Sequence, residues 1–86
     1  MEVAFKPSFV RQYKRLDPQL QTEVREKIEL FKDKTNHKQL KVHTLTGKLK
    51  GTLSFSVNYK IRIVFIYEHE DLAVLLAVGG HEIYNV

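Results

Sequence analysis

The segment LAVLLAVGGHEIY, residues 72–84, decides the fold of this chain. Residues 72–78 are apolar at every position, which is typical of a central strand or of one that is well covered on both faces. The pair Gly79-Gly80 then ends the strand and allows the backbone to turn. His81 and Tyr84 follow, so two side chains that can carry protons are expected at the end of a sheet.

Two further strands precede this segment. Residues 49–57 alternate between apolar and polar side chains, and residues 61–67 place every second apolar side chain on one face. A loop at residues 58–60 pairs Phe55 with Ile63 and keeps the apolar face whole. A shorter, two-residue loop would place an apolar residue opposite a charged one, so we predict the three-residue loop.

The first half of the chain predicts one strand and two helices. Residues 2–5 alternate weakly, as in a short strand. The Asp17-Pro18 pair stops one helix and starts the next, because aspartate caps a helix and proline suits its first position. In the second helix, Glu23 and Lys27 are spaced for an ion pair. Its apolar stripe consists of Leu20, Val24, Ile28 and Phe31.

The predicted architecture is α+β, in the order β-α-α-β-β-β, as a single domain over residues 1–86. A helical hairpin packs on one face of a small, mostly antiparallel four-stranded sheet. We expect the other face to stay open to solvent, because two helices can cover only one face. That face would carry Lys48, Lys50, Ser54, Ser56 and Arg62. Together with a net charge of +4, this surface favours a polyanionic partner such as a phosphate backbone.

The composition also excludes several classes of site. The absence of cysteine excludes a disulfide scaffold and thiolate metal sites. No H-x-x-x-H pair or supporting carboxylate spacing is present, so we expect neither a metal nor a cofactor. The N-terminus lacks the pattern of a signal peptide, and the longest apolar run, residues 72–78, is too short to cross a bilayer. We therefore expect a cytoplasmic protein with no membrane partner.

Four short motifs follow one another along the chain: HTLTG at 43–47, GTLSFSV at 51–57, KIRIVF at 60–65 and GGHEIY at 79–84. In this order and spacing they resemble the RelE/ParE superfamily of toxins from bacterial type II toxin–antitoxin systems. The family's corresponding patterns include H-x-L-x-G, Y-R-[IV]-x-[FY] and G-x-H-x-x-[VI]-Y. The resemblance covers nearly the whole chain and implies the RelE-like fold.

The resemblance also implies an activity and partners. RelE-like and YafQ-like members cut mRNA, usually at the ribosomal A site, and antitoxins encoded beside them neutralise them. ParE-like members share the fold but inhibit DNA gyrase. We favour an endoribonuclease, an mRNA interferase whose partners are mRNA, the ribosome and a cognate antitoxin. The alternative is a gyrase inhibitor that cuts no nucleic acid, or a catalytically degenerate member that binds an antitoxin.

Metal-free RNA cleavage requires a base for the 2′-hydroxyl, an acid for the leaving oxygen and cations for the phosphorane. His81 is the first candidate for acid or base, because histidine can serve in either role. Arg62 interrupts an apolar strand and is the candidate for stabilising the phosphorane. The resemblance adds His43 as a third catalytic candidate. The structural alternatives are that His81 is only a surface histidine, that Arg62 pairs with Glu82, and that His43 only orders its loop.

Lys48, Lys50 and Tyr84 are the candidates for RNA binding. The lysines could grip flanking phosphates, or they could be solvated lysines that protect an edge strand from aggregation. Tyr84 could stack on a base, or it could pack back on the sheet. The RelE type relies on a dense cluster of lysine and arginine, whereas the C-terminal segment here offers His81 beside acidic Glu82. This departure indicates either that the chain works like the family members that use histidine acid–base pairs, or that it is a poor nuclease.

Overall fold

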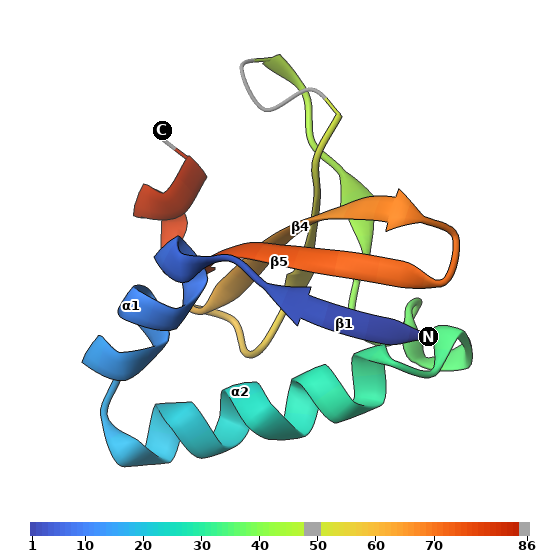
Figure 1. Ribbon diagram of the computed structural model, residues 1–86. Coiled ribbons are helices and arrows are strands. Elements are labelled where there is room, and N and C mark those ends of the chain that lie inside the picture. The colour runs from blue at the N-terminus through green and yellow to red at the C-terminus, as the bar shows by residue number, and fades with distance from the viewer. Residues whose placement is uncertain (48–50, 85–86) are drawn as a thin grey trace.

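The computed structural model describes residues 1–47 and 51–84 (Figure 1). The predicted α+β class and element order are confirmed. The elements are β1 (Glu2–Phe5), α1 (Pro7–Arg15), α2 (Pro18–Phe31), the short 3₁₀ turn η1 (Lys34–Asn36), β2 (His43–Thr44), β3 (Leu53–Ser56), β4 (Arg62–His69), β5 (Leu72–Gly79) and the 3₁₀ turn η3 (His81–Tyr84). Neither helix of the described chain combines the length and the apolar character needed to cross a bilayer.

The strands form one mixed sheet in the order β1-β5-β4-β3-β2. β5 lies between β1 and β4, so residues 72–78 are a central strand, as predicted. β1 runs parallel to β5 and the other pairs are antiparallel. The predicted three-residue loop is also confirmed, because Phe55 pairs with Ile63 and the Val57 N–H donates to the Ile61 carbonyl at 2.9 Å.

The predicted number of strands is wrong. The described residues form a sheet of five strands rather than four, because β2 pairs with β3 through His43–Thr44. The predicted order contains no strand at residues 43–44. Two residues are too few to show the alternation that identifies a strand in a sequence.

The core lies between α2 and one face of the sheet. Val24, Ile28 and Phe31 of α2 are buried, as their helical spacing predicts. The Phe31 ring stacks on Phe55 at 4.3 Å between centroids and meets Phe65 edge-on at 4.7 Å. These aromatic contacts join the helix to the two strands of the predicted hairpin.

The polar side of α1 completes the edge of β5. β1 pairs with β5 only as far as Leu75, so the following backbone groups of β5 have no strand partner on that side. The Ser8 hydroxyl donates to the Leu76 carbonyl at 2.7 Å, and the Gln12 side-chain oxygen accepts from the Val78 N–H at 2.9 Å. Side chains of α1 thus satisfy backbone groups that a further strand would otherwise bind.

The C-terminal turn covers part of the second face of the sheet. Figure 1 shows η3 and α2 on opposite sides of the sheet. Ile83 in this turn is 6% exposed, and Ser54 beneath it on β3 is 0% exposed. The expectation that Ser54 stays open to solvent is therefore wrong, because the chain folds back after Gly79. A Cβ atom on Gly79 would lie 2.8 Å from Ile83 Cγ2, so glycine is needed for this close approach.

Candidate functional site

A pair of hydroxyl groups forms the centre of the candidate site. Ser54 Oγ and Tyr84 Oη lie 2.7 Å apart, and either can be the donor. The Ser54 side chain is fully buried in the middle of β3, whereas Tyr84 is half-buried. Tyr84 therefore packs back on the sheet, which is the structural alternative considered from the sequence. Its ring nevertheless keeps a partly exposed surface.

Each residue of this hydroxyl pair has one predicted histidine as a neighbour. His43 is the direct partner of Ser54 in the β2–β3 ladder, and directly paired residues project to the same face. The His81 ring lies 5.6 Å from the Tyr84 ring, edge to face at 70°. Both histidines are exposed. The structure thus places His43 beside Ser54 in the sheet and His81 beside the Tyr84 ring, and the hydroxyl pair links these two neighbourhoods.

The hydrogen bond of His43 determines which of its ring nitrogens is available. Nδ1 lies 2.7 Å from the Lys41 carbonyl oxygen. A carbonyl oxygen can only accept, so Nδ1 carries the proton in this bond. In the neutral ring, Nε2 is then the nitrogen that can accept a proton.

Arg62 begins β4 at the same end of the sheet. Its partner on β5 is Gly79, the last residue before the turn that carries His81. Its guanidinium Nη1 donates to the carbonyl oxygens of Asn58 and of Ile61, the latter at 3.3 Å. The backbone of Arg62 therefore lies beside the candidate site, while its guanidinium is held by the hairpin loop.

The expected alternative partner of Arg62 is engaged elsewhere. The Glu82 carboxylate accepts from the Gly80 N–H at 2.9 Å, and among the described residues it forms no ion pair with Arg62. The two predicted RNA-binding lysines, Lys48 and Lys50, lie outside the described residues. Their roles, and the catalytic roles of the other candidates, stay predictions.

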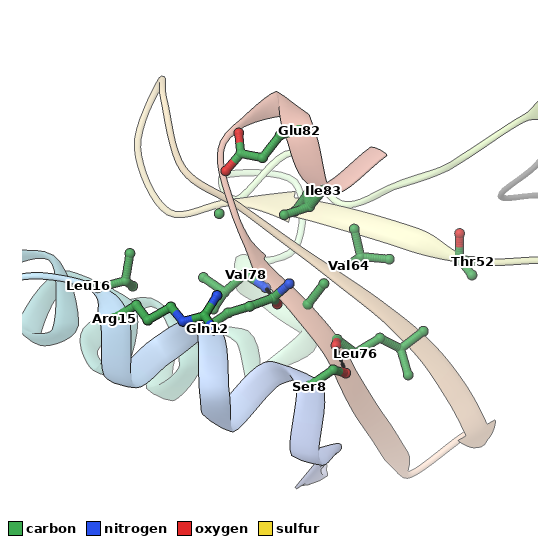
Figure 2. A pocket seen from close by; sticks show the side chains of 12 residues that line it. Ser8, Gln12, Arg15, Leu16, Thr52, Val64, Leu76, Val78, Glu82 and Ile83 are labelled. Atoms are coloured by element: carbon green, nitrogen blue, oxygen red, sulfur yellow. Dashed lines mark hydrogen bonds between the residues drawn. The ribbon is translucent and has the colours of Figure 1, made fainter. Parts of the chain in front are cut away.

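A pocket of about 520 Å³ lies between α1 and the C-terminal turn (Figure 2). Figure 2 shows side chains of α1 on one side of it and Glu82 and Ile83 of the C-terminal turn on the other. Val64 on its floor is the ladder partner of Ser54, which joins the pocket to the site. The lining includes Ser8, Gln12, Arg15, Thr52, Leu76 and Ile83.

Sequence reasoning missed the contribution of α1 to this pocket. The sequence pattern predicts that the solvated side of an amphipathic helix carries Ser8, Gln12 and Arg15. No local signal distinguishes these three residues from other surface residues. Ser54 was expected only as part of an open polar face. A serine between Leu53 and Phe55 in a buried strand is a usable signal, since a buried hydroxyl needs a partner.

Comparison with known proteins relates this architecture to others. No protein-family model and no curated protein sequence matches the chain. Several solved structures match it over nearly its whole length, including the following three. The toxin–antitoxin complex RelBE2 from Mycobacterium tuberculosis has a TM-score of 0.70 at 22% identity and covers 93% of this chain and 96% of its own. YafQ from E. coli has a TM-score of 0.74 at 13% identity, with 96% of each chain covered. The YoeB–YefM complex from Staphylococcus aureus has a TM-score of 0.73 at 16% identity and covers 94% and 97%.

The chain has the RelE-like toxin fold. This confirms the fold that the four sequence motifs imply. In this RelE-like chain, the motif containing His43 forms the edge strand β2, and the motif ending at Tyr84 forms the turn that covers Ser54. Two motifs that are far apart in the sequence therefore meet on one face of the sheet.

Proposed function

We propose that this chain is the toxin of a type II toxin–antitoxin pair and that it is an endoribonuclease acting on mRNA at the ribosome. The RelE-like fold supports the assignment as a toxin. One observation carries the nuclease proposal. His43 pairs with Ser54 in the sheet, the His81 ring packs against the Tyr84 ring, and the Ser54–Tyr84 hydrogen bond links the two.

The two histidines can supply both proton transfers of metal-free cleavage. His43 Nε2 takes the proton of the 2′-hydroxyl, and the 2′-oxygen then bonds to phosphorus. The bond from phosphorus to the 5′-oxygen breaks, and His81 gives a proton to that leaving oxygen. The products are a 2′,3′-cyclic phosphate and a 5′-hydroxyl. Tyr84 presents an aromatic ring on which a base next to the scissile bond can stack.

Arg62 is proposed to stabilise the charge that builds on the phosphorane. A guanidinium has five N–H donors, and the two loop carbonyls are bound by Nη1. The loop therefore holds the group in place, and within residues 1–47 and 51–84 no hydrogen bond engages Nε or Nη2, so these nitrogens keep donors for a phosphate. Lys48 and Lys50 are proposed to bind flanking phosphates.

The test is induced expression followed by mapping of mRNA ends, with matched histidine variants. His81→Gln and His43→Gln should each reduce cleavage by about 10²- to 10⁴-fold, the range for losing one acid or base. His69→Gln is the control, because His69 is an exposed histidine that accepts a hydrogen bond from the Asp71 N–H. Cleavage that survives in both site variants contradicts the proposed mechanism.

The ends of the RNA fragments test the chemistry separately. Purified protein and a synthetic RNA should give fragments with cyclic phosphate and 5′-hydroxyl ends. Ends of the opposite kind, a 3′-hydroxyl and a 5′-phosphate, contradict attack by the 2′-hydroxyl. This outcome would reject the mechanism even if the site variants lose activity.

The competing candidate is a gyrase inhibitor that shares the fold. The observation that favours it is the binding of the Arg62 guanidinium by loop carbonyls, with His81 beside acidic Glu82 in the terminal turn. Growth arrest with DNA damage and intact mRNA would support this candidate and reject the nuclease. Loss of supercoiling by purified gyrase would identify the target.

A cognate antitoxin is the proposed protein partner. The RelBE2 and YoeB–YefM structures are toxin–antitoxin complexes with a RelE-like chain. The gene beside this one should encode a short protein whose co-expression restores growth and which copurifies with the chain. If the neighbouring product neither restores growth nor copurifies, this assignment fails.

A further inference from the structure

We propose that the tip of the β3–β4 hairpin is a second contact for single-stranded RNA, separate from the cleavage centre. In this proposal the Tyr59 ring stacks on a base and the surrounding cations hold the adjoining phosphates. The inference rests on the proposed RNA substrate and deepens it, since apart from Arg62 it names residues that no catalytic step uses. It does not require that this chain cuts the RNA.

Tyr59 is displayed to solvent on an ordered loop. Its side chain is 80% exposed, more than the exposed large apolar side chains Phe5, Val10 and Tyr67. The loop beneath it is held by Asn58, whose side-chain oxygen accepts from the N–H groups of Lys60 and Ile61, each at 2.8 Å. A ring presented on an ordered loop loses little conformational entropy when it binds a partner.

Cations surround this ring. A pocket of about 280 Å³ at the foot of the loop is lined by Lys27 of α2, Lys41 and Arg62, together with Tyr59 itself. The Lys60 ammonium lies 5.6 Å from the centre of the Tyr59 ring. No carboxylate lines this pocket in the part of the chain that the structure describes.

The lysines of this pocket are available for an anion. The ion pair expected between Glu23 and Lys27 is not formed among the described residues. Lys41 adopts a positive φ of 60°, and its backbone carbonyl, rather than its ammonium, binds His43. The ammonium groups of Lys27 and Lys41 thus make no ion pair within residues 1–47 and 51–84.

The pocket is connected to the proposed cleavage centre along β3. Ser56 lines the pocket, and Ser54 lies two residues further along the same strand, which is about 7 Å at the usual rise of a strand. Both side chains project to the same face, because side chains alternate along a strand. Part of the pocket therefore lies on the same face as the hydroxyl pair, and an RNA strand bound at both places would follow β3.

This chemistry favours single-stranded RNA over other anions. Proteins that bind single strands combine aromatic rings that stack on bases with cationic grooves that follow the backbone. A free phosphate would use the lysines but not the exposed ring. An acidic protein segment is the competing occupant, and the test must separate the two.

The test measures binding of a fluorescent, non-cleavable 2′-O-methyl RNA of about twelve nucleotides by anisotropy. Tyr59→Ala should weaken binding about 5- to 150-fold, the range for losing one stacked base. Tyr59→Phe should bind as the parent does, because the ring is kept. Tyr59 is exposed, so far-UV circular dichroism should show an unchanged fold for both variants.

Charge variants test the cationic part of the surface. A double variant, Lys27→Gln with Lys41→Gln, should lower the slope of log affinity against log salt by about 1.4, or about 0.7 for each lost contact. The matched control is Lys6→Gln with Lys14→Gln, which removes the same charge from exposed positions of the α1 region. An equal loss in both double variants means a general charge effect and overturns the proposal.

The outcomes separate this inference from the nuclease. If Tyr59→Ala binds RNA as the parent does while the parent cleaves RNA, the inference fails and the nuclease stands. If the hairpin variants lose binding while the parent binds RNA without cleaving it, the inference stands and the nuclease fails. No binding by the parent at low salt overturns both. Hairpin variants that keep RNA binding and lose the antitoxin show a protein-docking surface instead.

Discussion

Replacing Tyr84 by phenylalanine leaves the Ser54 hydroxyl buried without its partner. The two oxygens lie 2.7 Å apart, and Ser54 is 0% exposed, so its hydroxyl has no solvent contact of its own in the folded chain. An unsatisfied buried polar group costs about 1–3 kcal/mol. We therefore expect Tyr84→Phe to lower the free energy of unfolding by about that amount.

Replacing Ser54 by alanine should lower the free energy of unfolding by less than Tyr84→Phe does. Ser54→Ala leaves the Tyr84 hydroxyl, which belongs to a half-buried side chain and can bind water. Its cost should be that of one ordinary hydrogen bond, about 0.5–1.5 kcal/mol. The double variant should be more stable than Tyr84→Phe alone, since removing both partners of a buried hydrogen bond is nearly neutral. This inequality is the main result expected from the double-mutant cycle.

The assay is urea unfolding followed by far-UV circular dichroism for the parent, both single variants and the double variant. At a slope of about 1–3 kcal/mol per molar urea, Tyr84→Phe should lower the midpoint by about 1 M. Tyr59→Phe is the control, because Tyr59 is 80% exposed and its hydroxyl forms no hydrogen bond among the described residues. Strictly additive single effects, or a Tyr84→Phe midpoint equal to that of Tyr59→Phe, would refute the buried hydroxyl pair.

Three further substitutions test the core, the turn and the pH dependence. Phe31→Ala removes the ring at the centre of the aromatic core and should lower the free energy of unfolding in urea by about 3–5 kcal/mol. A decrease of less than about 1 kcal/mol would contradict this packing. Gly79→Ala places a Cβ atom 2.8 Å from Ile83 Cγ2, so it should displace the terminal turn and lower both the melting temperature and RNA cleavage. Hydrogen bonds from the Thr35 hydroxyl and backbone N–H lower the pKa of Asp33 below its ordinary value of 3.8. The stability that this carboxylate contributes is therefore present above pH 3.8 and is lost as the pH falls through the lower pKa of the folded state. Asp33→Asn should accordingly lose less free energy of unfolding than the parent when the pH is lowered through this range. The same fall in stability with pH for both proteins would count against these hydrogen bonds.

The sequence by itself determined the elements whose signals are local. Residues 72–78 are apolar at every position, and they form the central strand because only a strand covered on both faces can bury such a run. The loop at 58–60 keeps Phe55 opposite Ile63, so the register followed from the rule that one face stays apolar. The Asp17 side chain accepts from the Leu20 N–H at 2.9 Å and caps α2, as the residue type predicts.

The candidate site could be predicted only in part. The motifs identified His43, His81 and Tyr84 as candidates, but nothing in the sequence showed that Ser54 would join them. The hydroxyl pair spans 30 residues, and its formation depends on the close approach of the terminal turn at Gly79. The predicted open face failed for the same reason, because the pattern of a strand does not show what a distant segment will place on it.

Tertiary structure alone decided how α1 and Arg62 are used. The Ser8 hydroxyl reaches a carbonyl of β5 that is 68 residues away, and Gln12 reaches an N–H that is 66 residues away. The Arg62 guanidinium binds carbonyls of its own hairpin loop instead of the acidic partner considered from the sequence. Helical and strand periodicities arise from neighbours along the chain, so a sequence displays them directly. The partner of a buried polar group depends on which distant segments pack together, and that depends on the free energy of the whole fold.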